Sequence, residues 1–291
     1  MIRCQTSARI AHIGVPRFSI SQVSTLGASF ADDLAAYAAA GIDGIGIWEM
    51  KLGDDSLERF EQSGLGAATA VPLVPSIHPL PLLPGPDEPR ERIDAILHSL
   101  HRLAPFNPSG VVCLTGPGDR ATVDEGLREI GAEAARLNLR LALEPFQREG
   151  IENWSIVNTL TEAVELLDEI GSDAIGIQFD TWHLWNTPDL LDEIAQHADR
   201  FVGVHVNDRR DPTRGWADRV LPGDGVIDLP TILGALDRAG WSGFYDLEIF
   251  SDNGAFGNSY DDSLWDVQPT ELARRARESF IACWTQRTVM A

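Results

Sequence analysis

Short apolar runs of strand length recur along the chain, and segments with helical spacing of apolar residues separate them. Runs of this kind, bounded by turn residues, are typical of strands buried on both faces of a parallel sheet. Near the N-terminus the strand-like alternation begins only at Phe18. The predicted strands cover residues 12–23, 42–48, 65–77, 110–114, 139–143, 174–180, 201–206 and 243–250.

The segments between these runs predict helices with recognisable ends. Around residues 160–167 apolar side chains recur at i, i+3, i+4 and i+7, and Gly171 follows as a stop signal. Proline is so dense in residues 79–86 that neither a helix nor a central strand is expected there. Predicted helix starts are Ser29 with Asp32, Thr122 with Glu125, Thr159 with Glu162, Thr187 with Pro188, and Asp228; further helices are expected near residues 54–62, 89–103 and 269–284.

Regular alternation of strands and helices indicates right-handed βαβ units and therefore a parallel sheet. Eight such units in 291 residues favour an α/β fold of the closed (β/α)8 TIM-barrel type over an open sheet. We find no change of composition that would divide the chain, so we expect one domain over residues 1–291.

The composition limits the partners and the compartment. The net charge of −21 would repel phosphate backbones, so we expect neither nucleic acid nor an anionic membrane as a partner. The apolar stretch at 65–74 contains Pro72 and is too short to span a bilayer. The first residues lack the apolar segment of a signal peptide, and the three widely spaced cysteines (Cys4, Cys113 and Cys283) suggest free thiols in a reducing cytoplasm.

The stretch from Ala174 to Asp208 combines two apolar runs with residues that can hold a metal ion. Asp180 and His183 close the first run, and His205 lies near the end of the second. The carboxyl ends of parallel strands meet at one edge of a sheet, where α/β proteins place their chemistry. We therefore expect these three side chains on the same side of the sheet.

Four strands in succession end in an acid or a histidine. A single acid at a strand end usually marks only the start of a loop, but carboxylates crowded at one barrel mouth would repel each other unless a cation held them. Three carboxylates and one imidazole suit a hard divalent ion. We expect one ion per chain, Mn²⁺ first, with Mg²⁺, Co²⁺ or Zn²⁺ as alternatives, bound by Glu144, Asp180, His205 and Glu248.

Other side chains near the predicted mouth are candidates for substrate contact. Trp48, with Trp182, Trp185 and Trp216, offers flat apolar faces that suit the C–H surfaces of a sugar. His78 follows the third predicted strand and could reach the mouth, while Arg219 either folds back towards the mouth or pairs with acids outside it. No dinucleotide-binding glycine motif or P-loop is present, so nucleotide cofactors are not expected.

Several segments carry a resemblance to a known family. They are L-A-L-E-P-F at 141–146, F-D-T-W-H at 179–183, V-G-V-H-V-N-D at 202–208, R-V-L-P-G-D-G-V-I-D-L at 219–229 and D-L-E-I-F at 246–250. Together they resemble the xylose isomerase-like TIM-barrel superfamily, and in particular its ketose 3-epimerases and inosose isomerases. The resemblance is strongest from 141 to 250 and weak before Ser29.

The resemblance implies roles for individual residues. Glu144, Asp180, His205 and Glu248 match the ligands of a single divalent metal, and the two glutamates match the catalytic acid and base on opposite faces of the substrate. His183 matches a histidine that contacts a substrate oxygen, and Arg209 or Arg210 matches an arginine with the same task. Glu149 and Glu152 compete for the role of a substrate-binding glutamate, with Glu152 the closer match.

The resemblance also implies a reaction: isomerisation or epimerisation of an unphosphorylated keto-sugar or inosose through an enediolate. Loss of a β-leaving group from the same intermediate would instead make the protein a lyase or dehydratase, acting on an inosose or a 3-keto-glycoside. A DNA-repair endonuclease of the superfamily would need a basic surface and more histidines at the mouth, and a non-catalytic sugar-binding barrel would not need both glutamates. Family members are often dimers or tetramers, so the resemblance implies a homodimer or homotetramer.

Overall fold

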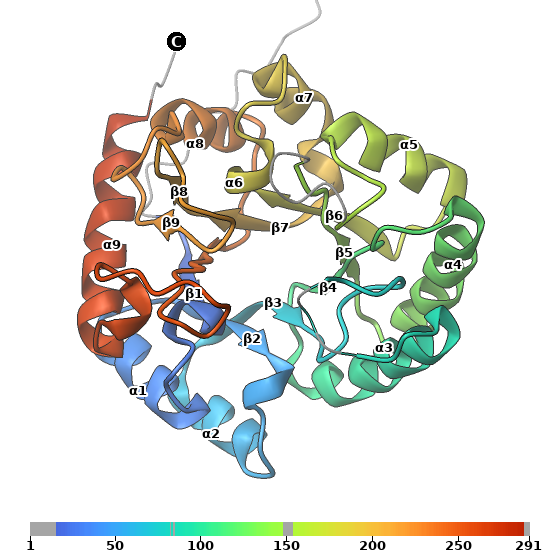
Figure 1. The fold of residues 1–291 in the computed structure, drawn as a ribbon, viewed down its shortest axis with the longest axis horizontal. Helices are drawn as coiled ribbons and strands as arrows, with labels where there is room; N and C mark the ends of the chain where they lie inside the picture. Colours follow the sequence, from blue (N-terminus) through green and yellow to red (C-terminus); the bar gives the residue numbers. More distant parts are fainter. Residues whose placement is uncertain (1–15, 82, 84, 148–153, 288–291) are drawn as a thin grey trace, which may run out of the picture.

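Eight parallel strands close into a barrel in the computed structural model, which describes residues 16–81, 83, 85–147 and 154–287 (Figure 1). The first strand pairs with both the second and the last, so this sheet has no open edge. The strands are β1 (Phe18–Ser21), β2 (Gly44–Trp48), β3 (Gly66–Val71), β4 (Gly110–Cys113), β5 (Leu141–Leu143), β6 (Ile175–Asp180), β7 (Phe201–Val206) and β10 (Tyr245–Leu247).

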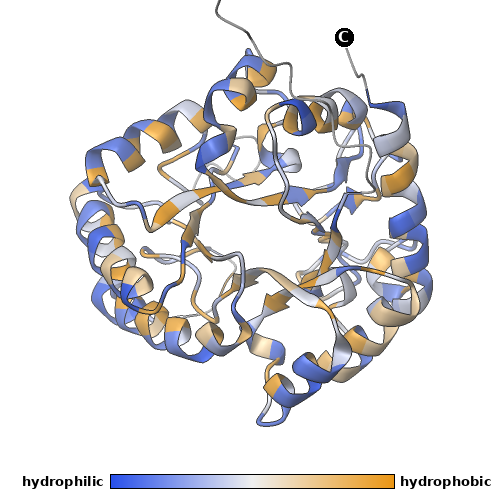
Figure 2. Cartoon of the chain, turned by 180° about the vertical axis from the view of Figure 1, so that it is seen from behind, coloured by the Kyte–Doolittle hydropathy of each residue, from blue (hydrophilic) through white to orange (hydrophobic). Residues whose placement is uncertain are grey.

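Helices surround the barrel, and each carries both hydrophobic and hydrophilic positions (Figures 1 and 2). In the helix at 120–136, for example, Val123, Leu127, Ile130 and Ala134 are buried, which is the stripe that helical periodicity predicts. The helices are α1 (Phe30–Ala39), α2 (Ser56–Ser63), α3 (Pro89–Leu103), α4 (Arg120–Arg136), α5 (Leu160–Ile170), α7 (Leu190–His197), α8 (Leu229–Arg238) and α9 (Pro269–Gln286), with 3-10 turns η1 (Gln22–Thr25), η2 (Glu49–Lys51), η3 (Ala104–Phe106), η4 (Ala198–Arg200) and η5 (Leu264–Asp266).

The (β/α)8 prediction is confirmed, but two predicted helix starts are wrong. Helix α4 begins at Arg120 rather than Thr122, because the Asp119 carboxylate accepts a hydrogen bond from the backbone N–H of Thr122 at 2.9 Å. Helix α7 begins at Leu190, after Asp189 in the left-handed conformation, and not at Thr187-Pro188.

The predicted third and eighth strands are too long, and two small features, a short helix and a pair of two-residue strands, were not anticipated. Strand β3 ends at Val71, before Pro72, which has no N–H for the ladder. A short helix, α6 (Thr181–Leu184), follows β6 directly, and β8 (Asp208–Arg209) pairs antiparallel with β9 (Arg219–Val220) after β7. Both additions lie at the carboxyl end of the barrel and shape its mouth.

The structure bears on two expectations from the sequence, that no segment spans a membrane and that the cysteines are free thiols. No helix of the described residues is long and apolar enough to cross a membrane. Cys113 and Cys283 are buried free thiols, whereas Cys4 lies outside the described residues.

Candidate metal centre

Four side chains converge where β5, β6, β7 and β10 reach the mouth of the barrel. Glu144 follows β5, Asp180 ends β6, His205 is the fifth residue of β7, and Glu248 follows β10. The ladder aligns them, since Asp180 pairs in register with His205. One ligand atom from each lies within 4.8 Å of the other three, and all four residues are buried. This is the set predicted from the strand ends.

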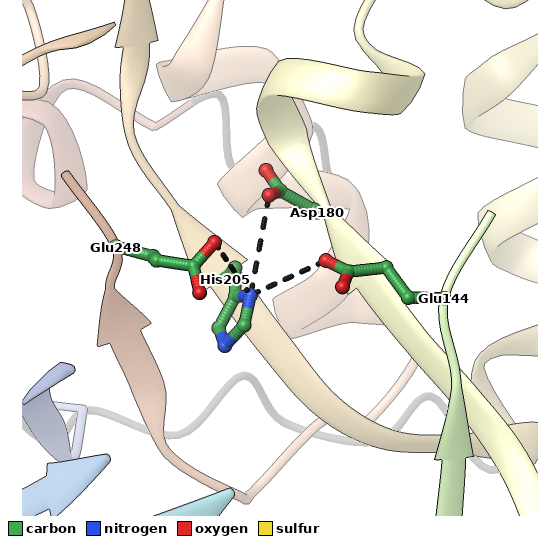
Figure 3. A group of neighbouring side chains, drawn as sticks. All are labelled: Glu144, Asp180, His205 and Glu248. Atoms are coloured by element: carbon green, nitrogen blue, oxygen red, sulfur yellow. Dashed lines mark ion pairs between the residues drawn. The ribbon is translucent and has the colours of Figure 1, made fainter. Parts of the chain in front are cut away.

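The Nδ1 atom of His205 lies at the centre of the cluster (Figure 3). It is 3.3 Å from Glu248 Oε2, 3.4 Å from Glu144 Oε1 and 3.9 Å from Asp180 Oδ2. Neither His205 Nδ1 nor Glu144 Oε1 has a hydrogen-bond partner within the described part of the chain. Buried polar atoms are rarely left without a partner, and three carboxylates with one imidazole are a suitable donor set for a divalent ion. The residues therefore fit one metal ion, and the donor set does not specify which.

Neighbouring polar groups orient two of the four candidate ligands. His205 Nε2 lies 3.3 Å from Thr69 Oγ1 and 3.8 Å from Asp246 Oδ2, and this arrangement leaves Nδ1 facing the cluster. Asp180 Oδ1 accepts hydrogen bonds from the backbone N–H of Trp182 at 2.8 Å and from Asn207 Nδ2 at 3.0 Å. The other oxygen of Asp180 is thereby directed at the cluster.

The two glutamates differ in their affinity for a proton. Burial raises the pKa of Glu144 to about 7, against the opposing effect of His205. Burial also acts on Glu248, but His205 and Arg219 outweigh it and hold the pKa of that carboxyl below its ordinary value. Two acids at one site with different proton affinities are suited to divide the roles of acid and base.

Arg219 folds back into the mouth, which resolves the alternative that the sequence left open. Its Nη1 atom donates to Asp180 Oδ2 and to Glu248 Oε2, each at 2.9 Å. Its Nη2 atom lies 3.4 Å from Nε2 of His183. Burial lowers the pKa of His183 to about 3, so this imidazole is neutral, and its ring centroid lies 4.1 Å from that of Phe146. A cation and a neutral imidazole thus stand beside the cluster.

A cavity opens beside these groups. Among the described residues, the charged and imidazole side chains of its lining are Glu144, His183, Arg219 and Glu248, which all lie at the cluster. The remaining lining is apolar, with the rings of Trp48, Phe146, Trp154, Trp182, Trp216 and Phe250 and the side chains of Val71, Pro75, Leu83, Val112 and Leu114. The described lining therefore has one polar end and walls of aromatic and aliphatic side chains.

The structure does not bring every predicted substrate-binding residue to this cavity. His78 Nε2 lies 3.3 Å from the carbonyl oxygen of Asp119, and the residue is not part of the lining. Arg210 pairs with Asp218 and Asp262, also away from the lining. Substrate binding by His78 and Arg210 stays a prediction that their positions do not favour.

The structure places Arg209, the alternative to Arg210, but it does not describe the two glutamates that compete for substrate binding. The Arg209 guanidinium lies 5.7 Å from the ring centre of Trp182 and 3.4 Å from Gln147 Oε1, so it is nearer the mouth than Arg210. Glu149 and Glu152 lie outside the described residues, so the role of Glu152 stays a prediction.

Sequence reasoning missed several residues that shape the site. Asn207 and Asp246 each lie two positions from a cluster residue on the same strand or its extension, so strand alternation could have placed them on the same face. Phe146, Trp154 and Phe250 line the cavity from loops, where periodicity carries no signal.

Comparison with known proteins gives evidence that is independent of the geometry of the site. The family model described as Xylose isomerase-like TIM barrel matches residues 34–283. The chain is similar to a D-psicose 3-epimerase of Enterocloster bolteae (29% identity, 57% of this chain, 53% of the relative). It is also similar to an inosose isomerase of Halalkalibacterium halodurans (36% identity, 32% of this chain, 35% of the relative). A third similar protein is an inosose dehydratase of Geobacillus thermodenitrificans (27% identity, 48% of this chain, 50% of the relative). The chain thus spans about half, or a third, of the length of these curated relatives.

Solved structures share the fold. A protein from Sinorhizobium meliloti 1021 aligns with a TM-score of 0.80 at 23% identity, covering 92% of this chain and 98% of that one. The IOLI protein, whose structure is described as having a binding zinc atom, aligns with a TM-score of 0.74 at 20% identity, covering 94% of this chain and 100% of that one. The 3-keto-D-glucoside 4-epimerase YcjR from E. coli aligns with a TM-score of 0.70 at 18% identity, covering 93% of this chain and 100% of that one.

Proposed function

Because the chain belongs to the xylose isomerase-like TIM-barrel family, we propose that it is a divalent-metal-dependent isomerase or epimerase of an unphosphorylated keto-sugar or inosose. The observation that carries this proposal is the buried cluster of Glu144, Asp180, His205 and Glu248 at the polar end of a cavity. The similar proteins named above include sugar epimerases and isomerases.

The chemistry requires removal of a proton from the carbon next to a carbonyl group. A bound divalent ion would supply Lewis acidity that polarises the carbonyl and makes the neighbouring C–H more acidic. Glu144 and Glu248 flank His205 from opposite sides, so one can remove the proton and the other can return it from the other face (Figure 3). Arg219 and neutral His183 are placed to hold substrate oxygens.

The destination of the proton decides the product. Return to the same carbon of the enediolate from the opposite face gives an epimer. Return to the neighbouring carbon, with a hydroxyl proton moved between the two oxygens, gives an isomer. The aromatic walls of the cavity exclude water from the intermediate and so limit side reactions.

A lyase or dehydratase on the same site is the second candidate. The similarity to an inosose dehydratase favours it. The reaction would start with the same proton removal by a glutamate, but the intermediate would then expel a β-leaving group. A lasting absorbance from a conjugated enone product would distinguish this outcome from epimerisation.

The proposal includes an ion, an assembly and a location. We propose Mn²⁺ as the ion, because oxygen donors dominate the cluster. We propose a homodimer or homotetramer by likeness to the family, and a cytoplasmic location because Cys113 and Cys283 are free thiols.

The test is metal-dependent exchange of a carbon-bound proton. The protein is purified without chelator, its metal content is measured, and it is incubated in D₂O with a panel of ketoses and inososes while proton NMR follows deuterium uptake. Glu144→Gln and Glu248→Gln should each reduce exchange by about 10²-fold or more. Glu165→Gln, on the exposed face of α5, is the matched control and should leave exchange unchanged. Exchange that persists in both active-site variants would refute the proposal.

A further inference from the structure

A second hollow adjoins the cavity and is apolar throughout. We call it the outer groove. It shares with the cavity the side chains of Trp48, Val71, Pro75, Leu83 and Phe250, so the two spaces meet along a common wall. The rest of its lining is Val23, Leu26, Met50, Pro72, Leu73 and Phe256.

Two of the groove residues are unusually exposed for their type. Met50 is 58% exposed and Leu73 is 59% exposed. Within the described part of the chain, the other exposed large hydrophobic residues are Leu191 and Val226, which line a different hollow beside α7 and α8. Exposed apolar side chains that gather at one hollow mark a surface on which an apolar group can be buried.

The shared wall is fixed in place. Trp48 Nε1 donates a hydrogen bond to Ser21 Oγ at 2.8 Å, and the Trp48 and Phe250 rings meet edge to face with centroids 5.9 Å apart. Trp48 is partly exposed, so a ligand held at the polar end of the cavity can extend along its ring.

The distribution of polar groups bears on what fills the combined space. Among the described residues, every charged or imidazole side chain that lines the cavity lies at the metal cluster, and the other side-chain hydrogen-bonding groups of that lining are the indole N–H groups of its tryptophans. The described lining of the outer groove has no charged or hydrogen-bonding side chain except the indole of Trp48, which is already paired. A free sugar carries hydroxyl groups along its whole length. Hydroxyls placed against the described lining of the outer groove would lose their hydrogen bonds to water without replacement.

We propose that the outer groove binds an apolar group attached to the substrate, so that the substrate is a keto-glycoside with an aryl or alkyl aglycone rather than a free ketose. This inference rests on the proposed function, because the α-hydroxyketone part must occupy the polar end beside Glu144 and Glu248. The aglycone then passes Trp48 and Phe250 and lies between Met50 and Leu73.

Equilibrium binding tests the groove without relying on turnover. Phenyl β-glucoside and methyl β-glucoside are titrated into the metal-loaded protein by calorimetry. We expect the phenyl compound to bind about tenfold more tightly or better, because its ring leaves water. In the double variant Met50→Asn/Leu73→Asn this preference should fall to about twofold or less. The control Leu191→Asn/Val226→Asn removes two other exposed apolar side chains, 40% and 47% exposed, away from the groove and should keep the preference.

The outcomes separate this inference from the reaction. Equal affinities of the wild-type protein for the two glucosides would overturn it, as would an unchanged preference in the groove variant. Light scattering that shows a wild-type dimer dissociated by Met50→Asn/Leu73→Asn would also overturn it, since the groove would then be a contact between copies. A phenyl preference that depends on the groove, with no deuterium exchange on any ketose, inosose or aryl keto-glycoside, would support the groove and reject the proposed reaction.

Discussion

Arg219 Nη1 lies 2.9 Å from Asp180 Oδ2, an oxygen that also faces the candidate metal cluster. The guanidinium is buried, and its central carbon lies 5.1 Å and 4.9 Å from the ring centres of Trp182 and Phe250. A buried cation next to three carboxylates offsets part of their mutual repulsion when no metal is bound. The same cation faces the cavity, so it can bind a substrate oxygen.

Arg219→Gln should therefore destabilise the metal-free protein more than the metal-loaded one. Loss of one partner from a buried ion pair typically costs about 3–5 kcal/mol, because an uncompensated charge remains. A bound divalent ion would supply the missing positive charge. Thermal unfolding in chelator and in excess Mn²⁺ should show a wider gap between the two conditions for the variant than for the wild-type protein.

Arg274→Gln is the matched control for this comparison. Arg274 pairs with Glu271 and Glu278 and all three side chains are exposed, so its loss should hardly change the free energy of unfolding. An equal loss of stability in Arg219→Gln with and without metal would contradict the electrostatic role.

Asp180→Asn should abolish tight metal binding while the fold is kept. The amide oxygen can still accept the hydrogen bonds from Trp182 and Asn207, but the charge that faces His205 is lost. Since loss of an outer partner alone weakens metal affinity about 10–100-fold, loss of a ligand charge should weaken it at least that much. Metal content after dialysis measures this, with Asp192→Asn on the exposed side of α7 as the control. Full metal content in Asp180→Asn would place the ion elsewhere.

The sequence predicts the barrel and the four-residue cluster because both depend on local signals. Apolar runs identify the strands, and strand ends place Glu144, Asp180, His205 and Glu248 at one mouth. The position of Arg219 could not be read in this way, because it depends on the β8–β9 pairing after a loop without periodicity. For the same reason the positions of Phe146 and Trp154 could not be predicted, because tertiary packing and not a periodic sequence pattern fixes their loops.

Asp246→Asn should flatten the pH dependence of stability in the metal-free protein. Burial raises the pKa of Asp246 to about 7, against the opposing charge of His205, whereas an unfolded aspartate titrates near 3.9. Between these values the native state binds the extra proton, so the stability that Asp246 contributes is present below about pH 4 and is lost as the pH rises towards 7. Asparagine does not titrate, and it can still accept from Ser19 Oγ.

Urea unfolding in chelator from pH 4.5 to 8 tests whether the free energy of unfolding falls as the pH rises. The wild-type protein should lose stability relative to Asp246→Asn across the range, by at most about 1.4 kcal/mol for each unit of pKa shift. Parallel curves for the two proteins would show that Asp246 is already ionised in the native state below pH 5.

Gly44→Ala should destabilise the barrel without touching the metal site. A Cβ atom at Gly44 would lie 2.5 Å from Phe244 Cε1 and 2.7 Å from the carbonyl oxygen of Gly66, which is backbone and cannot rotate away. Phe244 is itself held beneath the Arg17 guanidinium, which lies 3.7 Å from its ring centre. Overpacking of this kind costs about 1–3 kcal/mol. Gly27→Ala, where no atom lies within 4 Å of the added carbon, should change stability by about 0.5 kcal/mol or less.

Gly44 and Gly66 are the first residues of β2 and β3, so the strain falls at the amino end of the barrel, opposite the mouth. Residues at that end of a TIM barrel support stability, whereas those at the carboxyl end support catalysis. We therefore expect the unfolding midpoint in urea to fall while metal content stays at the wild-type level. A Gly44→Ala protein with wild-type stability would mean that the β1–β2–β3 sheet can widen here, and a loss of bound metal would mean that the strain reaches Asp180 and His205 through the strands.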